Sequence, residues 1–331
     1  MSGYLNKKEY CCVDLFKFIF SIFIVFIHTD PLEDYKHIKT LFTIRYYIKN
    51  GLCRIAVPFF FICTGFLLFK KIRWESNDNE PIKKYLLKLF KLLGIWFFIS
   101  FYLSKVVLWY LVAVITSLLI IVLLRKLKVS FKVSFILSSI LYVIGYVFES
   151  YYYIVCNLLN NNILKYILFI YEYFSDTTRN GLFFGLFFVM LGINFSRKEI
   201  IIKKPILFTG IILSILMLII EIYFIIGLKC AKDYNLYLSL VLIEFFLFYL
   251  AISLELKNSY QKFRVYSTII FFSHAPIYEI LVFLNIMISK LLPVNFGSVF
   301  YSMTCLIASL LLSVFIEKES KKYNWIQNLY S

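Results

Sequence analysis

The chain has 331 residues, of which 61% are hydrophobic and only 16% are charged, and its mean hydropathy is +0.82. Soluble domains have about 25% charged residues, so this composition excludes a soluble globular protein. Lys and Arg outnumber Asp and Glu by 35 to 19, a net charge of +16 that in a soluble protein would suggest nucleic-acid binding. Because the chain is so apolar, we expect instead a protein whose partner is the lipid bilayer, with no nucleic-acid partner.

Long apolar runs separated by short polar breaks predict an all-α, polytopic integral membrane protein, since roughly 20 apolar residues span a bilayer as a helix. About ten such spans use up the chain, so we expect residues 1–331 to form a single transmembrane domain. The stretch 163–174 is too short to span and is expected at the membrane interface. The ten predicted spans are 11–28, 52–70, 86–104, 107–125, 133–155, 180–196, 205–228, 236–254, 266–288 and 295–316.

The distribution of Lys and Arg predicts the orientation through the positive-inside rule. With the N-terminus in the cytoplasm, 21 of the 35 basic residues fall in inner segments, 10 fall in outer loops and four lie within spans. An even number of spans then places both termini in the cytoplasm. We expect a multi-pass protein of a cell membrane, the bacterial cytoplasmic membrane.

The first predicted span carries the most informative ionisable residues. A charge at the centre of a membrane helix costs about 2.5–3.5 kcal/mol, so charged residues there mark functional sites unless they are paired. Lys17 and His28 are eleven residues apart, a rise of about 16 Å, which places the lysine near the inner leaflet and the imidazole near the outer end. At 100° per residue, four polar residues fall on one stripe about 60° wide: Asp14, Lys17, Ser21 and His28.

Each of these residues has a structural alternative. Asp14 lies one turn from Lys17, and an ion pair between them would explain both. A lone histidine at a helix end is more often structural than catalytic, but the shared polar stripe favours a site role for His28. His274, in the ninth span, is either a second site residue or a core histidine, and we favour the core; His37, in the first outer loop, is expected to be solvated.

Later segments add weaker signals. Glu149 and Arg179 are expected near the same membrane level as His28, and Arg54 lies at that level as well. Gly181 and Gly185 form a GxxxG pattern, which predicts a close helix contact. The in-span glutamates need partners or water, and the sequence assigns no role to them: Glu221, Glu244 and Glu279.

Several chemistries find no support. The seven cysteines form no CxxC pair and no Cys/His cluster with zinc spacing, so we interpret them as small buried hydrophobic residues and expect no metal. The chain has no Gly-x-Ser-x-Gly elbow, no Walker loop, no dinucleotide glycine motif and no HExxH.

The motifs carry a family resemblance. VDLFKFIFSIFIVFIH resembles the first-helix signature of the membrane-bound acyltransferase 3 family, a basic residue and a histidine separated by ten positions, which Lys17 and His28 match. RIAVPFFFICTGFLLFKK at 54–71 resembles its second-helix pattern, and KLFK at 88–91 stands where the family often has Arg-x-x-Arg. FFSHAPIYEI at 271–280 is similar to a late histidine-proline segment of that family. DTTRNGLFFGLFFVMLG at 176–192 resembles the membrane portion of serine racemase proteins linked to glycopeptide resistance.

The resemblance implies transfer of an acyl group, usually acetyl, from cytoplasmic acyl-CoA to a hydroxyl or amine of a cell-envelope glycan, a lipid-linked sugar or a related acceptor. A separate extracytoplasmic transfer partner is a further implication. Acetyl-CoA is then the donor substrate, with its phosphates expected at Lys17, Lys88 and Lys91.

His28 is the candidate general base or transient acyl carrier in this scheme. Arg54 and Arg179 are the candidates to stabilise an oxyanion or to bind an anionic acceptor, and interfacial snorkelling is their structural alternative.

Two other functions compete with this interpretation. Charged residues in spans also mark a substrate path, so a transporter or flippase of a small polar substrate such as serine is the alternative. A transporter would show an internal repeat or Gly/Pro-broken helix pairs, and the sequence has neither. A structural membrane protein without chemistry leaves the polar stripe of the first span unexplained.

Overall fold

The computed structural model describes residues 10–100, 107–158, 166, 177–197, 200–254, 260–291 and 296–331. All regular secondary structure within these ranges is helical, which confirms the predicted all-α class. The helices are α1 (Cys11–Thr29), α2 (Lys39–Lys49), α3 (Ala56–Phe69), α4 (Glu80–Ser100), α5 (Leu108–Lys126), α6 (Phe131–Ser150), α7 (Tyr152–Leu158), α9 (Leu186–Arg197), α10 (Lys204–Leu228), α11 (Leu238–Ser253), α12 (Gln261–Leu291) and α13 (Ser298–Glu319). Short helical turns are η1 (Glu33–Tyr35), η2 (Leu52–Ile55), η3 (Gly181–Gly185) and η4 (Asn324–Leu329).

Seven helices of the described chain are long and apolar enough to cross a membrane, by length and composition. They are Cys11–Thr29, Lys39–Phe69, Leu108–Lys126, Phe131–Ser150, Lys204–Leu228, Gln261–Lys290 and Ser298–Glu319, and two shorter apolar helices cover Gly181–Arg197 and Leu238–Ser253. The multi-pass membrane character is therefore supported, while the count of ten spans and the orientation of the termini stay predictions. The predicted interfacial stretch 163–174 lies outside the described residues, apart from Tyr166.

Two predicted boundaries differ from the structure. The first outer loop, predicted between the spans that end at 28 and begin at 52, contains α2, which continues through η2 into α3. None of the residues of α2 is buried, so its amphipathic turns lie along the surface of the bundle. The predicted span 133–155 is divided at Tyr151, where the backbone of Tyr153 donates to the carbonyl of Cys230 and so leaves the helical ladder.

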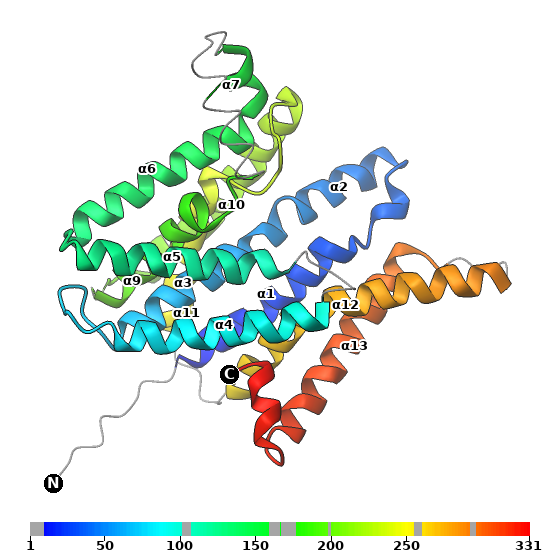
Figure 1. The fold of residues 1–331 in the computed structure, drawn as a ribbon. Coiled ribbons are helices and arrows are strands. Elements are labelled where there is room, and N and C mark those ends of the chain that lie inside the picture. Colours follow the sequence, from blue (N-terminus) through cyan, green and yellow to red (C-terminus); the bar gives the residue numbers. More distant parts are fainter. Residues whose placement is uncertain are drawn as a thin grey trace.

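The core is centred on α3, which packs along α1 on one side and along α9 on the other. Of the most apolar window in Lys39–Phe69, 78% is buried, compared with 22% in α6 and in α10. Figure 1 shows α1 in the middle of the bundle, beside α12 and α3. α6 and α10 are therefore outer helices, α3 is enclosed by protein, and α1 is about half enclosed.

Glycines allow two close helix contacts in this core. A Cβ at Gly192 of α9 would collide with the backbone carbonyl of Ile62 in α3, and a Cβ at Gly65 would collide with the carbonyl of Val189. At Gly181 the added Cβ would collide with the carbonyl of Ala113 in α5. The predicted close helix contact of the GxxxG pattern is therefore confirmed.

Candidate active site

His28 lies in the last turn of α1, next to the place where the chain turns away at the left-handed residue Asp30. Its side chain is partly exposed and lines a pocket of about 350 Å³. The opposite wall comes from α12 and from the start of α13, through Tyr278, Asn285 and Tyr301. The imidazole is thus accessible from a cavity at one end of the bundle.

A second imidazole stands beside His28. The ring centroids of His28 and His274 are 5.2 Å apart, with an interplanar angle of 34°. His274 is fully buried in α12, its Nδ1 lies 3.0 Å from the carbonyl oxygen of Ile270, and its Nε2 has no hydrogen-bond partner among the described residues. Because a carbonyl can only accept, Nδ1 carries the proton and Nε2 keeps a free lone pair. His274 is therefore both buried, as favoured, and part of the candidate site.

Arg54 and Arg179 also converge on His28, because both guanidinium groups contribute to its electrostatic environment. Arg54, in η2, donates to Asn50 Oδ1 at 3.2 Å, and Arg179 donates to Asn235 Oδ1 at 3.0 Å. In each guanidinium the Nε–H is buried and has no partner in the part of the chain that the structure describes. The site thus contains two cations with a free donor each, which suits an anion or a developing negative charge.

The segment before η3 holds Arg179 in place. Glu149, buried at the end of α6, accepts hydrogen bonds from Thr177 Oγ1 at 2.9 Å, Thr178 N at 2.8 Å and Thr178 Oγ1 at 2.6 Å. The Arg179 guanidinium in turn lies over the ring of Trp109, 4.6 Å from its centroid. Burial and then repulsion from Arg54 lower the pKa of Arg179 below its ordinary value. Glu149 is therefore a positioning residue. From the sequence it was expected near the membrane level of His28, but no role was assigned to it.

The mouth of the pocket is built on an ion-pair cluster. Asp30 accepts hydrogen bonds from Arg45 at 2.7–3.1 Å and from Lys49 at 2.5 Å, both on α2. Burial by itself would raise the pKa of Asp30, but the hydrogen bonds from Arg45 and Lys49 outweigh it and hold that pKa below its ordinary value. The cluster explains why α2 folds back over α1, and it keeps Lys49 beside His28.

At the other end of α1, Lys17 lies close enough to Lys88 of α4 to act on it electrostatically, and Arg264 and Lys71 act on the same amine. Asp14 pairs with Arg264 of α12, at 2.8 and 3.1 Å, and not with Lys17, so the alternative of a local Asp14–Lys17 pair is wrong. An Arg presents a bidentate fork to a carboxylate, which the single ammonium of a lysine cannot match. Lys17 therefore has no ion pair with Asp14, and it lies near other cations.

Lys91 lies apart from Lys17 and Lys88. Its ammonium donates to Asn328 Oδ1 in η4, and Trp96, on the same helix, donates to the carbonyl of Leu329 at 3.1 Å. Of the three lysines expected to act together, the structure brings only Lys17 and Lys88 near each other. Lys71 and Arg264 lie with them. The sequence did not indicate Lys71 or Arg264, because both lie at the ends of predicted spans. Basic residues are common at such positions whatever their function.

A polar group of side chains lies between the two ends. Thr64 of α3, ten residues and about 15 Å along from Arg54, lies near the side chains of Tyr85 and Tyr110. Its own hydroxyl donates to the carbonyl of Phe60 at 3.1 Å. Hydroxyls from α3, α4 and α5 therefore meet in the interior, where single tyrosines gave no signal in a sequence so rich in aromatics.

The in-span glutamates separate into different roles. Glu221 of α10 accepts from the backbone of Leu238 at 2.8 Å and of Ser239 at 2.9 Å, so it caps the start of α11. Glu279 is exposed on α12. Glu244 is fully buried, and neither of its carboxyl oxygens has a partner among the described residues.

Comparisons with known proteins agree with the sequence motifs. Residues 12–107 match the acyltransferase 3 family model, described as an acyltransferase domain. An amino-acid racemase of Enterococcus faecalis is 30% identical over 211 residues, which cover 56% of this chain and 28% of that protein. A serine/alanine racemase of Enterococcus gallinarum is 26% identical over 266 residues, 71% of this chain and 36% of that protein. No solved structure gives a significant match.

The predicted resemblance to the membrane-bound acyltransferase 3 family is thereby confirmed, and it supports a membrane acyltransferase in general. The matched region contains Lys17, His28, Arg54 and Lys88. The chain spans only about a third of the length of the curated relatives that it matches, 28% and 36% in these two cases.

Proposed function

We propose that this protein transfers an acyl group, acetyl in the simplest case, from cytoplasmic acyl-CoA to a hydroxyl or amine of a cell-envelope glycan or related acceptor. One observation carries the proposal: His28 lines a pocket, stands beside His274 and lies within electrostatic range of Arg54 and Arg179, while Lys17 and Lys88 lie within electrostatic range of each other towards the opposite end of α1. A base with cations at one end and phosphate-binding charges at the other are the groups that this transfer requires.

In the proposed reaction, His28 accepts the proton of the acceptor hydroxyl while the hydroxyl oxygen attacks the carbonyl carbon of the thioester. The new C–O bond gives a tetrahedral intermediate, and its collapse breaks the C–S bond, so that the leaving thiolate of CoA takes the proton from the imidazole. The oxyanion of the tetrahedral intermediate is stabilised by the partnerless Nε–H groups of Arg54 and Arg179. A short-lived acyl group on His28, passed on to the acceptor or to a separate extracytoplasmic partner, is a variant of the same chemistry.

The orientation of the helices supports a donor that enters from the inner side. Asp14 contacts Arg264 and His28 contacts His274, so α1 and α12 run in the same direction. The first and ninth of ten spans are expected to run in the same direction, because successive spans cross the membrane in alternating directions. The hydroxyls at Thr64, Tyr85 and Tyr110 lie between the two ends, where a polar pantetheine arm needs hydrogen-bonding partners.

The pocket at His28 suits a small polar acceptor group. Two buried polar atoms that have no hydrogen-bond partner among the described residues line its wall, Oδ1 of Asn285 and the hydroxyl of Tyr301. Such atoms are costly unless a ligand or water meets them, so they favour an acceptor that carries hydroxyl or amine groups. The names of the relatives add serine and alanine to the acceptors worth testing.

The test is consumption of acetyl-CoA by the purified protein in nanodiscs, with and without candidate acceptors. We expect His28→Ala to lower turnover by about 10²–10⁴-fold while acetyl-CoA binding stays within about twofold, because a base contributes mainly to the transition state. His37→Ala is the matched control, since His37 is exposed in the turn before α2 and lies away from the pocket lining. Turnover by His28→Ala equal to that of the wild type would contradict the mechanism.

A second candidate, transport of a small polar substrate such as serine, is favoured by Glu244. An ionisable side chain buried inside a membrane bundle without a partner is typical of substrate or proton pathways. Uptake of labelled serine into proteoliposomes separates the two functions. Uptake without any loss of thioester, and its disappearance in Glu244→Gln, would replace the acyltransferase proposal.

A further inference from the structure

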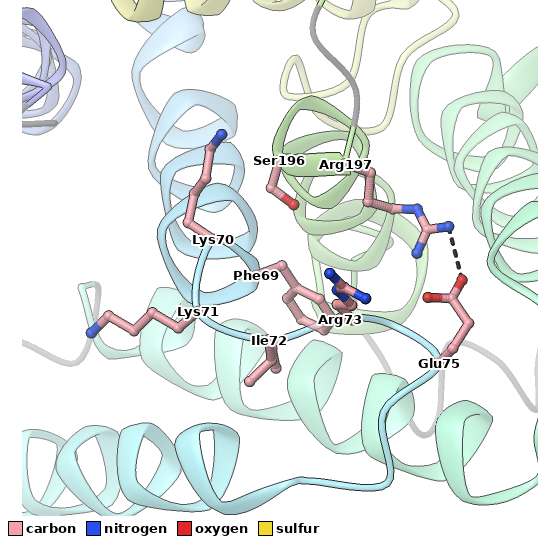
Figure 2. Close-up of a pocket in the computed structure, with 8 residues that line it drawn as sticks. All are labelled: Phe69, Lys70, Lys71, Ile72, Arg73, Glu75, Ser196 and Arg197. Carbon is pink, nitrogen blue, oxygen red and sulfur yellow. Dashed lines mark hydrogen bonds and ion pairs between the residues drawn. The ribbon is translucent and has the colours of Figure 1, made fainter. Parts of the chain in front are cut away.

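A second pocket lies at the ends of α3 and α9 that are remote from His28. Its volume is about 450 Å³, and Figure 2 shows the side chains around it. Arg73, Arg197 and Glu75 gather on one side, whereas Lys71 extends to the opposite side. The residues that line it are Phe69, Lys70, Lys71, Ile72, Arg73, Glu75, Ser196 and Arg197.

The wall of this pocket is a loop held in one conformation by a buried arginine. Arg125, at the end of α5, is 6% exposed and donates to the backbone carbonyls of Arg73, Trp74, Ser76 and Asp78 at 2.5–3.2 Å. It also donates to Asn79 Oδ1 at 2.7 Å. All of its nitrogens are thus used on a single loop. A connection that only joined two helices would not need a buried charge to define its shape.

The charges of the pocket favour an anion. Four cationic side chains and one carboxylate line it, a net charge of +3. Arg197 is fixed by an ion pair with Glu75 at 2.8 Å and by the ring of Phe131, 4.5 Å from its centroid. The hydrogen bond from Arg197 lowers the pKa of Glu75, so this pair stays ionised at neutral pH. Glu75 accepts from Nη2 of Arg197, so this guanidinium keeps further N–H donors for an anion, while Lys70, Lys71 and Arg73 are not compensated by any acid of the lining.

The pocket adjoins the cations at the inner end of α1. Lys71 lines the pocket and also acts electrostatically on Lys88, which is influenced by Lys17 as well. Lys71 thus belongs to the pocket and lies within electrostatic range of the cations at Lys88. Acyl-CoA carries two separate anionic groups, a pyrophosphate next to the pantetheine arm and a 3′-phosphate on the ribose.

We propose that the pocket between α3 and α9 binds the 3′-phosphorylated adenosine end of the donor, through Arg73 and Arg197, while Lys17 and Lys88 bind the pyrophosphate. This assignment rests on the proposed function, because it specifies which part of the donor each group of cations binds. Lys71 then lies between the two phosphate groups. The sequence expected the donor phosphates at lysines of α1 and α4 and did not indicate this pocket.

The experiment measures binding of adenosine 3′,5′-bisphosphate to the full-length protein in nanodiscs. We expect Arg73→Ala with Arg197→Ala to weaken binding about tenfold, because charge-assisted contacts with the phosphates are lost and salt screens contacts at an open pocket. The matched control is Lys126→Ala with Lys132→Ala, which removes two exposed cations from neighbouring segments outside the pocket lining. The pocket variant, Arg73→Ala with Arg197→Ala, should bind acetyl-CoA more weakly than the wild type does. It should bind acetyl-dephospho-CoA, which lacks the 3′-phosphate, about as well as the wild type does.

The outcomes separate this inference from the proposed function. Equal loss of bisphosphate binding in the pocket variant and the control, or unchanged binding in both, overturns the nucleotide assignment even where thioester turnover depends on His28. If bisphosphate binding depends on Arg73 and Arg197 but no turnover is measured, the nucleotide assignment of the pocket is supported and the proposed acyl transfer is contradicted. Nanodiscs with anionic lipid provide a further arm, since complete displacement of the nucleotide by that lipid would assign the pocket to a lipid headgroup instead.

Discussion

The two ends of α1 are built in different ways. Around His28 the polar groups are few and are held by packing and hydrogen bonds from α12, η2 and the segment before η3. At the other end the cations are numerous, several are exposed, and they come from helix ends and loops. Chemistry at a reacting carbon needs fixed distances, whereas attraction of a multiply charged donor tolerates mobile side chains. The difference indicates that the end at His28, predicted to be the outer one, depends on tertiary packing, and that the end at Lys17, predicted to be the inner one, depends on charge.

The largest expected effect comes from disturbing the tight contact between α3 and α9 in the core, between the two ends. Gly192→Ala inserts a Cβ against the carbonyl of Ile62, where neither helix backbone can move aside, so we expect a loss of about 1–3 kcal/mol in stability and of most activity. Scanning fluorimetry in detergent measures the thermal midpoint. Gly94→Ala is the control, because a Cβ there meets nothing within 4 Å. Equal midpoints for the two variants would show that the α3–α9 contact is not tight.

An intermediate effect is expected from the charges of the inner end. Lys17→Ala with Lys88→Ala should raise KM for acetyl-CoA about tenfold with little change in kcat, because phosphate attraction acts on donor binding. The effect should shrink as salt is raised, since both lysines are partly exposed and salt screens their charges. Lys39→Ala with Lys290→Ala removes two cations from exposed positions predicted to lie on the outer side and serves as the control. A fall in kcat at unchanged KM would instead place these lysines in the chemical step.

The smallest effect concerns the mouth of the His28 pocket and its pH dependence. The pKa of Asp30 is lowered in the folded protein, so its contribution to stability is present above the unfolded value of about 3.9 and is lost as the pH falls through the folded value. Asp30→Asn should therefore lower the thermal midpoint at pH 7 by an amount equivalent to about 1 kcal/mol. The difference from the wild type should vanish at low pH. A difference that grows on acidification would reverse the assigned direction.

Much of the outer site could be predicted, because its residues belong to motifs or to costly in-membrane charges. His28, Arg54 and Arg179 were expected at one level, and the structure brings them together. His274 was interpreted as a core residue because a buried histidine usually has partners, and its free Nε2 appears only once α12 is placed against α1. The role of Glu149 depends on Thr177 and Thr178, which lie far along the chain and carry no signal of their own.

The inner site was predicted less well, since basic residues on the inner side of a membrane protein are common whatever their function. Lys91 has the same spacing pattern as Lys88 but turns towards η4. Arg264 was counted only as an inner-loop charge, and it is the partner of Asp14. A local pair was the natural expectation for Asp14, because sequence periodicity compares only residues on the same helix.

The amino-acid sequence by itself determined the helical, membrane-spanning class and the polar face of the first helix, because hydropathy and helical periodicity are local properties of the chain. It also determined the resemblance to acyltransferases, through short motifs in the first spans. Only the tertiary structure decided which helix lies against that polar face, that Asp14 is neutralised by Arg264, and that His274 stands beside His28. The physical reason is that these contacts join residues about 250 positions apart, and their geometry follows from how whole helices pack.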